Sequence, residues 1–504
     1  MVTNSFIDKL KEDSNFVETE NGGISHKTTL KKVYDMFALG GAYRSRSDED
    51  CILLFKNAFE EDQTLALKCL FYLRDIRGGQ GERRFFRVCF NWLAKEYPDV
   101  AKRNLVNLAE YGRYDDLYCV VHTPVENDMF KLIKDQLKLD YESLKSGEKE
   151  GVSLLAKWVK SENASSQETK DLGNRTREYL QMSHKQYRKM LSALRTRINI
   201  VEKLMSENRW NEIEFDKIPS RAGLIYRNAF AKRDADRYAE FMKSKETKVN
   251  AGALYPYDIV SKVTEKLSHW YYNDDNITEV ERKALNKYWA NLKDYLNGEK
   301  CSMMCVVDTS GSMTGGYGQI APIDVAISLG MYCAERLSGP FHNNFISFAS
   351  RPQFIEIEGI DFVDKVKRIY AKNLVDNTDL TAVFSLLKSV ALTPGVNRED
   401  IPKTIVVISD MEIDHGSYWR TENSRQTEME AIRAEWAAAG LEMPKLVYWN
   451  VCARHNLILD DAANDDVTFV SGCSPVIFES VITGKSGWDL CLDKLMSERY
   501  DKVK

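Results

Sequence analysis

The 504-residue chain lacks the features that define several classes of protein. No apolar run reaches the roughly 18 residues that a membrane-spanning helix needs, and no basic stretch followed by an apolar one opens the sequence. With 27 glycines and 11 prolines the chain is neither collagen-like nor of low complexity. We therefore expect a globular protein that does not associate with a membrane.

Cysteine pairs at metal-binding spacings are also missing. The ten cysteines are scattered, mostly within apolar runs such as LKCLFYL and RVCFNWL, and no CxxC occurs. Zinc fingers and disulfide frameworks both need regular cysteine spacings. Buried thiols in a reducing compartment explain the pattern better, so we expect a cytoplasmic protein.

The common motifs of hydrolytic catalysis do not occur. The seven histidines are dispersed, and neither HExxH nor GxSxG is present. The glycine-rich run RGGQG (residues 77–81) lacks the lysine and hydroxyl of a GxxxxGK[ST] phosphate loop. An acidic cluster at Asp410, Glu412 and Asp414 follows a predicted strand, where it can shape the metal site described below without carrying out a reaction. We expect a binding protein and not an enzyme.

What the chain does contain is two halves with different patterns, as its length leads us to expect. In residues 1–298, apolar positions recur at intervals of three and four, which predicts successive helices in a HEAT-like α-helical repeat domain. In residues 299–504, short β-rich runs alternate with helical stretches. This alternation predicts a doubly wound, Rossmann-like α/β domain with a mostly parallel sheet.

Charge is divided unevenly along the chain. The net charge of -5 combines 51 basic and 47 acidic residues in 1–300 with 19 basic and 28 acidic residues in 301–504. Residues 151–250 alone hold 21 basic and 13 acidic side chains. Such an excess is typical of a polyanion-binding segment, but a solvated helix face would produce it equally well.

Oxygen-bearing side chains follow the ends of predicted strands in the second half. In α/β sheets, ligands bind outside the carboxyl ends of the strands. Hard oxygen donors suit Mg²⁺, or another divalent cation such as Mn²⁺. The candidate ligands are Asp308, Ser310 and Ser312 in DTSGSM, Thr378 in DNTDLTAVF, and Asp410 at the end of TIVVISD. Few charges and several hydroxyls would leave coordination positions for water and for one outside group.

These motifs, in this order, resemble the metal-ion-dependent adhesion site of von Willebrand factor A domains. By that resemblance the three DTSGSM donors are the DxSxS ligands, Thr378 is the loop threonine, and Asp410 is the last acidic position. Thr381 is a second candidate for the threonine. The resemblance implies a Mg²⁺ ion that captures an Asp or Glu of a protein partner. A metal with a purely structural role is the alternative.

The N-terminal half carries a second resemblance. The runs LRDIRGGQGERRFFRV, AEYGRYDDLY and IPSRAGLIYRNAFAKRDADRYAEF are similar to an uncharacterised family of bacteria, eukaryotes and large DNA viruses. Its members join a helical region to a von Willebrand A-like region. That family is distantly similar to the Ro ribonucleoprotein, in which a TROVE domain, a ring of HEAT-like helices, is closed by a von Willebrand A domain. Because Ro binds small noncoding and misfolded RNAs, the resemblance implies RNA binding by a ribonucleoprotein-like scaffold.

Three basic clusters in the helical half are candidates for contact with RNA. Arginine binds phosphate through two donors, and aromatic rings stack on unpaired bases. The clusters surround the RGGQG bend, the run HKQYRKMLSALRTR and the run IPSRAGLIYRNAFAKR. The candidate residues are Arg74, Arg77, Arg83, Arg84, Lys185, Tyr187, Arg188, Lys189, Arg195, Arg221 and Arg227.

The same clusters have a second interpretation. The arginines of the RGGQG bend would pair internally with Asp75 and Glu82 if the bend is only a joint between two helices. The chain would then be a protein-interaction or scaffold module, for example in a virus particle, that uses only the metal site. Clusters that line one groove favour RNA binding, whereas internally paired clusters on separate faces favour the scaffold.

Overall fold

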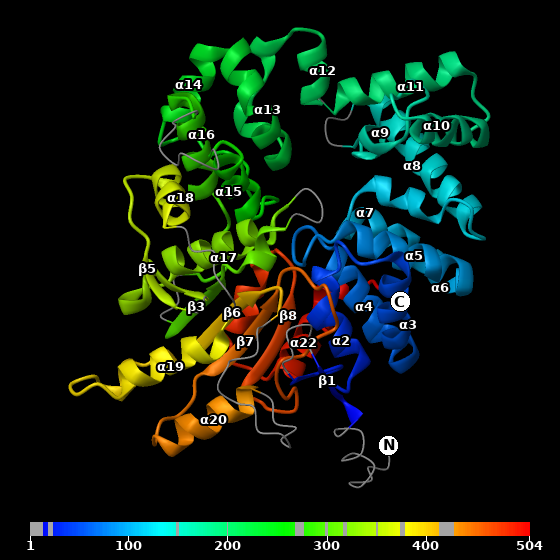
Figure 1. The fold of residues 1–504 in the computed structure, drawn as a ribbon. Helices are drawn as coiled ribbons and strands as arrows, with labels where there is room; N and C mark the ends of the chain where they lie inside the picture. The colour runs from blue at the N-terminus through cyan, green and yellow to red at the C-terminus, as the bar shows by residue number, and fades with distance from the viewer. Residues whose placement is uncertain are drawn as a thin grey trace.

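Helices make up most of the first 297 residues, and a six-stranded sheet follows (Figure 1). The computed structural model describes residues 14–18, 24–147, 151–198, 200–267, 277–297, 301–315, 320–348, 351–372, 379–412 and 428–504. Within these ranges, no helix has both the length and the apolar character that crossing a bilayer requires. All ten cysteines are described, and none of them forms a disulfide.

The helical part begins with a short antiparallel hairpin, β1 (Phe16–Glu18) and β2 (Ile24–His26). Several helices start at a side-chain cap, in which the hydroxyl or carboxylate accepts a backbone N–H bond, as at Ser47 and Asp62. The helices are α2 (Lys32–Leu39), α3 (Asp48–Glu61), α4 (Gln63–Arg74), α5 (Arg83–Glu96), α6 (Pro98–Asn104), α7 (Leu108–Tyr111), α8 (Glu126–Ser146), α9 (Leu155–Trp158), α10 (Gln167–Tyr179), α11 (His184–Arg197), α12 (Val201–Ser206), α13 (Ser220–Arg233), α14 (Ala235–Lys243), α15 (Pro256–Thr264) and α16 (Glu279–Ala290). A 3₁₀ segment, η3 (Tyr114–Val120), follows α7.

The α/β part is built on one sheet whose six strands are the six β-rich runs of the sequence. The strands are β3 (Met303–Asp308), β4 (Asn344–Phe348), β5 (Gln353–Glu356), β6 (Thr404–Ser409), β7 (Lys445–Asn450) and β8 (Val467–Ser471). Their order is β5-β4-β3-β6-β7-β8, and every neighbouring pair is parallel except β4 and β5. The prediction of a mostly parallel α/β sheet is confirmed.

Helices on the sheet leave its central strands buried. They are α17 (Pro322–Arg336), α18 (Phe362–Ala371), α19 (Leu380–Ala391), α20 (Glu428–Ala438), α21 (Phe478–Val481) and α22 (Gly487–Leu495). All six residues of β3 are buried, as expected for a strand covered on both faces. From β3 the chain adds β4 and β5 on one side of the sheet, and it then adds β6, β7 and β8 on the other side. The order of the strands therefore reverses between β3 and β6. Their carboxyl ends form the topological switch point, where such sheets bind ligands.

The helical part begins and ends against the α/β part, as the arc of helices in Figure 1 shows. At its beginning, α2 packs on β8, where the Ser471 hydroxyl donates to the Phe37 carbonyl at 3.0 Å. At its end, α16 packs on α18, and the Trp289 and Phe362 rings stack with centroids 4.5 Å apart. The two ends of the arc also meet each other, because the Tyr255 hydroxyl donates to the Gln80 carbonyl at 3.2 Å. The arc is therefore closed through direct contacts.

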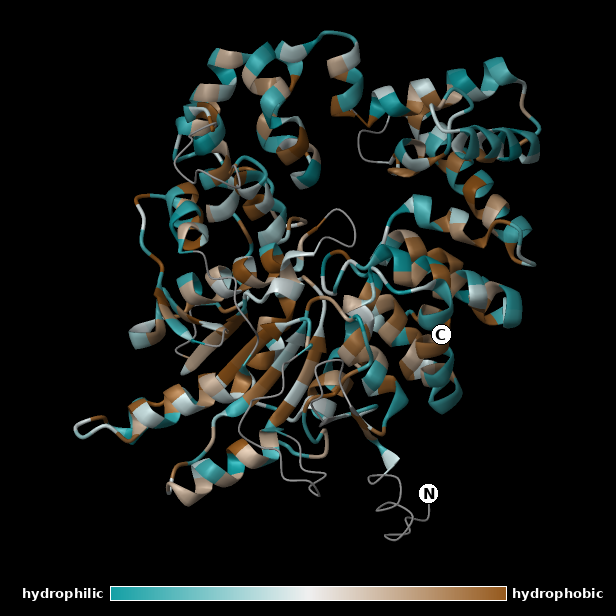
Figure 2. Ribbon diagram, viewed as in Figure 1, coloured by the Kyte–Doolittle hydropathy of each residue, from teal (hydrophilic) through white to brown (hydrophobic). Residues whose placement is uncertain are grey.

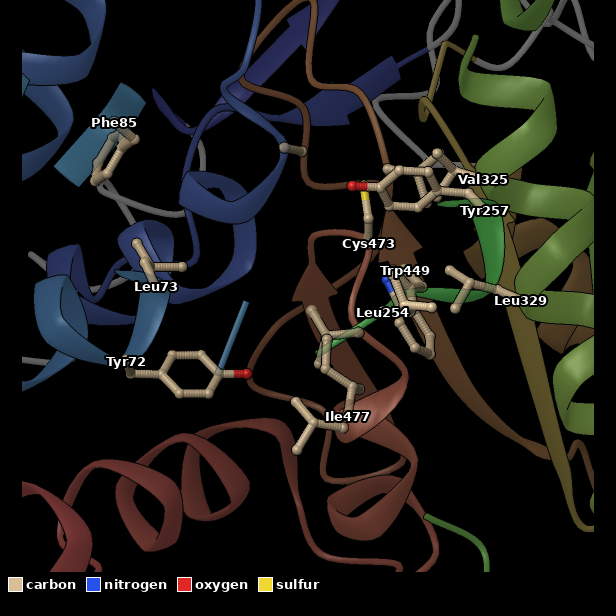
Figure 3. Close-up of a cluster of buried hydrophobic side chains, with 14 of the residues drawn as sticks. Tyr72, Leu73, Phe85, Leu254, Tyr257, Val325, Leu329, Trp449, Cys473 and Ile477 are labelled. Carbon is tan, nitrogen blue, oxygen red and sulfur yellow. The ribbon is translucent and has the colours of Figure 1, made fainter. Parts of the chain in front are cut away.

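Hydrophobic residues concentrate in the central strands and in the helices that surround them (Figure 2), and most of their side chains are buried. Figure 3 shows a buried cluster to which Tyr72 and Phe85 of the helical part and Trp449 of β7 contribute. Because the two parts share apolar core, neither buries its full apolar surface alone. The predicted domain boundary between residues 298 and 299 lies outside the described residues.

Candidate metal centre

Two carboxylates lie at the switch point of the sheet. Asp308 is the last residue of β3 and Asp410 directly follows β6, and the two strands are parallel with Val307 opposite Ile408. Both carboxylates therefore leave the sheet at the same edge. Asp308 is fully buried and Asp410 is 2% exposed, which is unusual for acidic side chains without a full set of cationic partners.

Hydrogen bonds fix the loop that leaves β3. The backbone N–H of Ser310 donates to one oxygen of Asp308 at 2.8 Å, and the Ser409 hydroxyl donates to the other. The hydroxyl oxygens of Ser310 and Ser312 are 2.9 Å apart. The loop thus holds the Asp308 carboxylate in one orientation and places two hydroxyls next to each other.

The two carboxylates destabilise each other's charge. Burial raises the pKa of Asp308 to about 7, and the negative charge of Asp410 contributes to the increase. Burial also raises the pKa of Asp410, although the Arg454 guanidinium, 3.4 Å from one Asp410 oxygen, acts in the opposite direction. A divalent cation between the carboxylates would replace their repulsion by attraction.

A third acidic side chain lies just beyond this pair. The backbone N–H of Glu412 donates to Asp410 at 3.1 Å, and one Glu412 carboxylate oxygen is 2.8 Å from Nδ1 of His455. The other oxygen of Glu412 is buried and has no hydrogen-bond partner among the described residues. The sequence indicated Glu412 only as part of an acidic cluster, and Arg454 and His455 gave no local signal because they follow a different strand, β7.

The predicted threonine ligand is not tested by these contacts. Thr378 lies outside the described residues, as does Asp414. Thr381, the second candidate, lies on α19 and its hydroxyl donates to the Glu428 carboxylate. In the described part of the chain, no three His, Cys, Asp or Glu side chains gather closely enough to hold a metal. The donors at the switch point are therefore two carboxylates and two hydroxyls, which are hard oxygen ligands of the kind that Mg²⁺ takes.

Four of the eleven RNA-binding candidates are engaged inside the protein. Arg74 is buried and pairs with the buried Asp116 at 2.6 Å, and Arg227 pairs with Glu281 at 2.7 Å. The guanidinium of Arg195 donates to two backbone carbonyls and to the Ser161 hydroxyl. The fourth, Tyr187, is fully buried and donates to the Lys160 carbonyl at 2.7 Å. Through these contacts the four side chains hold elements of the helical part together, and Tyr187 and Arg195 also line an open groove between α9, α11 and α12.

The RGGQG bend is a joint, but its acidic neighbours pair differently from the predicted way. Asp75 accepts from Arg499, and Glu82 pairs with Arg44 at 2.8 Å. Close packing explains the glycines, since a Cβ on Gly79 would lie 1.8 Å from the Tyr72 carbonyl oxygen. Of the bend's candidates, Arg77 donates to the Glu110 carbonyl, Arg84 pairs with Asp48, and Arg83 is exposed.

The remaining candidates lie on exposed surfaces of two different helices. Lys185, Arg188 and Lys189 are exposed on α11, and the opposite face of α11 is buried, as the helical periodicity predicts. Arg221, on α13, is 62% exposed and lies 3.6 Å from Asp258. The basic candidates therefore do not form one continuous cluster.

Taken together, the fold and the site define a protein that joins a closed arc of helices to a doubly wound α/β part with a buried carboxylate pair at its switch point. Residues 19–130 and 159–300 match the family model described as a domain of unknown function, DUF2828, and residues 302–491 match another such domain, DUF7788. The first match spans half of the chain, which therefore belongs to the DUF2828 family.

A relative that aligns over most of the chain comes from a virus. The chain is 27% identical over 513 residues to a protein of Acanthamoeba polyphaga mimivirus described as uncharacterized protein L728. The alignment covers 94% of this chain and 85% of the viral protein. The similarity thus includes both the helical part and the α/β part.

Proposed function

We propose that this chain is a binding protein, not an enzyme, whose α/β part holds Mg²⁺ and offers it to an acidic group of a protein partner. The observation that supports this most is the buried pair Asp308 and Asp410 at the switch point, next to the hydroxyls of Ser310 and Ser312. The strand order and the DxSxS loop are those expected of a von Willebrand A-like domain. Mn²⁺ would suit the same donors.

In this proposal each residue has a defined task. Asp308, Ser310 and Ser312 bind the cation directly, Thr378 completes the set, and Asp410 acts directly or through water. The bound cation supplies a Lewis-acidic position for a carboxylate oxygen. The hydrogen bonds from Ser409 and from the Ser310 backbone keep Asp308 oriented toward the cation. With only two carboxylates in the set, the cation retains enough positive charge to attract an acidic group.

Replacement of Ser310 by alanine tests the site. We expect Ser310→Ala to weaken Mg²⁺ binding at least about tenfold in isothermal titration, because it removes a ligand and leaves the rest of the loop in place. Ser328→Ala is the matched control, since Ser328 is also a buried serine but lies on α17 and donates to the Val325 carbonyl. Equal Mg²⁺ affinities for the two variants would contradict the proposal.

We propose RNA binding by the helical part, in a Ro-like manner, as a second function. Its support is the exposed basic face of α11 beside an open groove of about 670 Å³ between α9, α11 and α12. Arg188, Lys157 and Lys203 line this groove. Acidic residues line it too, and Lys157 lies 3.5 Å from Glu202. A TROVE-like ring of HEAT-like helices is the architecture that this function would use, and the closed arc of helices supports the proposal.

Charge reversal on α11 tests this second function. We expect Arg188→Glu with Lys189→Glu to weaken binding of an RNA hairpin with a single-stranded 3′ tail, with little dependence on sequence, because phosphate contacts carry affinity and not specificity. The slope of log K against log salt should fall by about 1.4, for two lost contacts. Lys131→Glu with Lys134→Glu, which changes two exposed lysines of α8, is the control. An unchanged slope would count against the α11 face.

A further inference from the structure

Four cationic side chains gather where α5, η3 and the segment after α9 meet, in front of the buried Arg74. They are Arg83, Arg87, Arg113 and Lys160, which we call the Arg83–Lys160 cluster. Two carboxylates, Asp115 and Asp116, lie among them, and Glu168 acts on Lys160 as well. The cluster therefore has an excess of positive charge.

Both inner carboxylates are already shared between arginines. Asp116 accepts from Arg74 and, through its other oxygen, from Nε of Arg87 at 2.6 Å. Asp115 lies 2.8 Å from Arg87 and accepts from Arg113 at 2.8 Å. Three guanidiniums thus use the charge of two carboxylates, so the pairs themselves retain a net positive charge.

Arg83 and Lys160 add to this excess. Within the described residues, neither side chain makes a hydrogen bond or an ion pair, and Arg83 is exposed. Partial burial of its guanidinium and the positive charges of Arg87 and Arg113 lower the pKa of Arg83 against the opposing charges of Asp115 and Asp116. Burial, followed by the same two arginines, lowers the pKa of Lys160 against the opposing charge of Asp115. The two cations therefore repel Arg87 and Arg113, and the nearby carboxylates, which the other arginines already share, compensate them only in part.

Several of the cations are held in fixed positions. The Arg113 guanidinium lies over the Trp158 ring, 4.2 Å from its centroid, and the Lys160 ammonium lies 5.4 Å from the centroid of Tyr118. Arg87 is fixed by Asp115 and Asp116. An anion that binds here would order few additional side chains, which lowers the entropic cost of binding.

We propose that the Arg83–Lys160 cluster binds the phosphate groups of an RNA backbone. Arginine forks match phosphate oxygens in geometry, and phosphodiesters keep their negative charge at any physiological pH. The groove described above is adjacent to the cluster, because segment 157–163 carries Lys160 and lines the groove through Lys157 and Ser161. A linear polyanion can reach both places at once, which a compact anion cannot. The inference rests on the proposed binding of RNA by the helical part.

The test is a paired charge reversal in the full chain, measured by fluorescence anisotropy with a labelled, unstructured single-stranded RNA across a salt titration. We expect Arg83→Glu with Lys160→Glu to weaken RNA binding at least tenfold and to reduce the salt slope by about 1.4, for two phosphate contacts. Lys131→Glu with Lys134→Glu changes the net charge equally and should alter affinity less than twofold. Arg83→Gln with Lys160→Gln gives the same test with a milder change, in case the charge reversal disturbs folding.

The outcomes separate the inference from the function on which it rests. If the wild type does not bind RNA, both the RNA function and this inference fail. If the wild type binds and the Arg83 and Lys160 variants bind equally well, the inference fails and the RNA function stands. Competition by polyglutamate as effective as that by RNA of equal charge would show a site for acidic peptides and would overturn the assignment to phosphate. Competition by inorganic pyrophosphate at far lower charge concentrations than RNA would overturn the assignment to a polymer.

Discussion

Replacing Asp308 by asparagine is expected to stabilise the metal-free protein and to abolish its stabilisation by Mg²⁺. The pKa of Asp308 is raised from 3.8 to about 7, so a charged Asp308 at about pH 8 lowers the free energy of unfolding of the metal-free protein. The shift corresponds to roughly 4 kcal/mol, and the loss of one hydrogen bond to asparagine offsets about 1–3 kcal/mol of it. We expect a net gain of about 1–3 kcal/mol, measured by unfolding in a chelator.

The pH dependence of this difference has a definite sign. A carboxyl whose pKa is higher in the folded than in the unfolded state destabilises the fold above the folded pKa, and the effect disappears as the pH falls to the unfolded value. The advantage of Asp308→Asn should therefore be full above about pH 7 and should vanish toward pH 4. With Mg²⁺ in excess, the wild type should be the more stable protein at pH 8, because only its site binds the cation.

Asp460→Asn is the matched control for Asp308→Asn. Asp460 is also a fully buried aspartate of the α/β part, but it pairs with Arg433, whose Nη1 donates to it at 2.6 Å. Its replacement should lower stability in the chelator and leave the stabilisation by Mg²⁺ unchanged. If Asp308→Asn behaves like this control in both respects, Asp308 is a structural carboxylate and the metal assignment is wrong.

The sequence predicted the sheet and its candidate site because both are encoded in short segments. A run such as TIVVISD is apolar over the length of a strand and ends in a carboxylate, so its identity and its functional end are visible together. Parallel pairing then requires that Asp308 and Asp410 meet at one edge. The same reasoning could not find Arg454, which approaches Asp410 from the loop after β7.

The basic candidates were harder to assign because partners distant in the sequence decide their role. Arg74 pairs with Asp116 and Arg227 with Glu281, across 42 and 54 residues, and Arg499 reaches Asp75 across 424. A local run shows that an arginine is available, but not whether a carboxylate from another helix will neutralise it. For the same reason, Arg83, Arg87, Arg113 and Lys160 do not stand out as a cluster until the fold brings them together.

Arg74→Met is expected to cost about 3–5 kcal/mol of stability, although the sequence pattern had indicated Arg74 as an RNA contact. Arg74 is 2% exposed and Asp116 is fully buried, so the variant leaves a buried carboxylate with one cation fewer. Arg83→Met, nine residues along, makes the same chemical change at an exposed side chain. It should alter stability by less than about 0.5 kcal/mol in denaturant unfolding while weakening RNA binding.

The two variants thus separate a structural arginine from a binding one with the same pair of measurements. The buried Asp116 also accepts from Arg87 and from the backbone N–H of Arg113. We therefore expect Arg74→Met to fold, but with lower stability. A stable Arg74→Met that binds RNA poorly would mean that the ion pair between Arg74 and Asp116 opens and that Arg74 contacts the RNA backbone. An unstable Arg83→Met would mean that Arg83 pairs with a carboxylate inside the protein. The cluster would then lack the excess positive charge that attracts a phosphate.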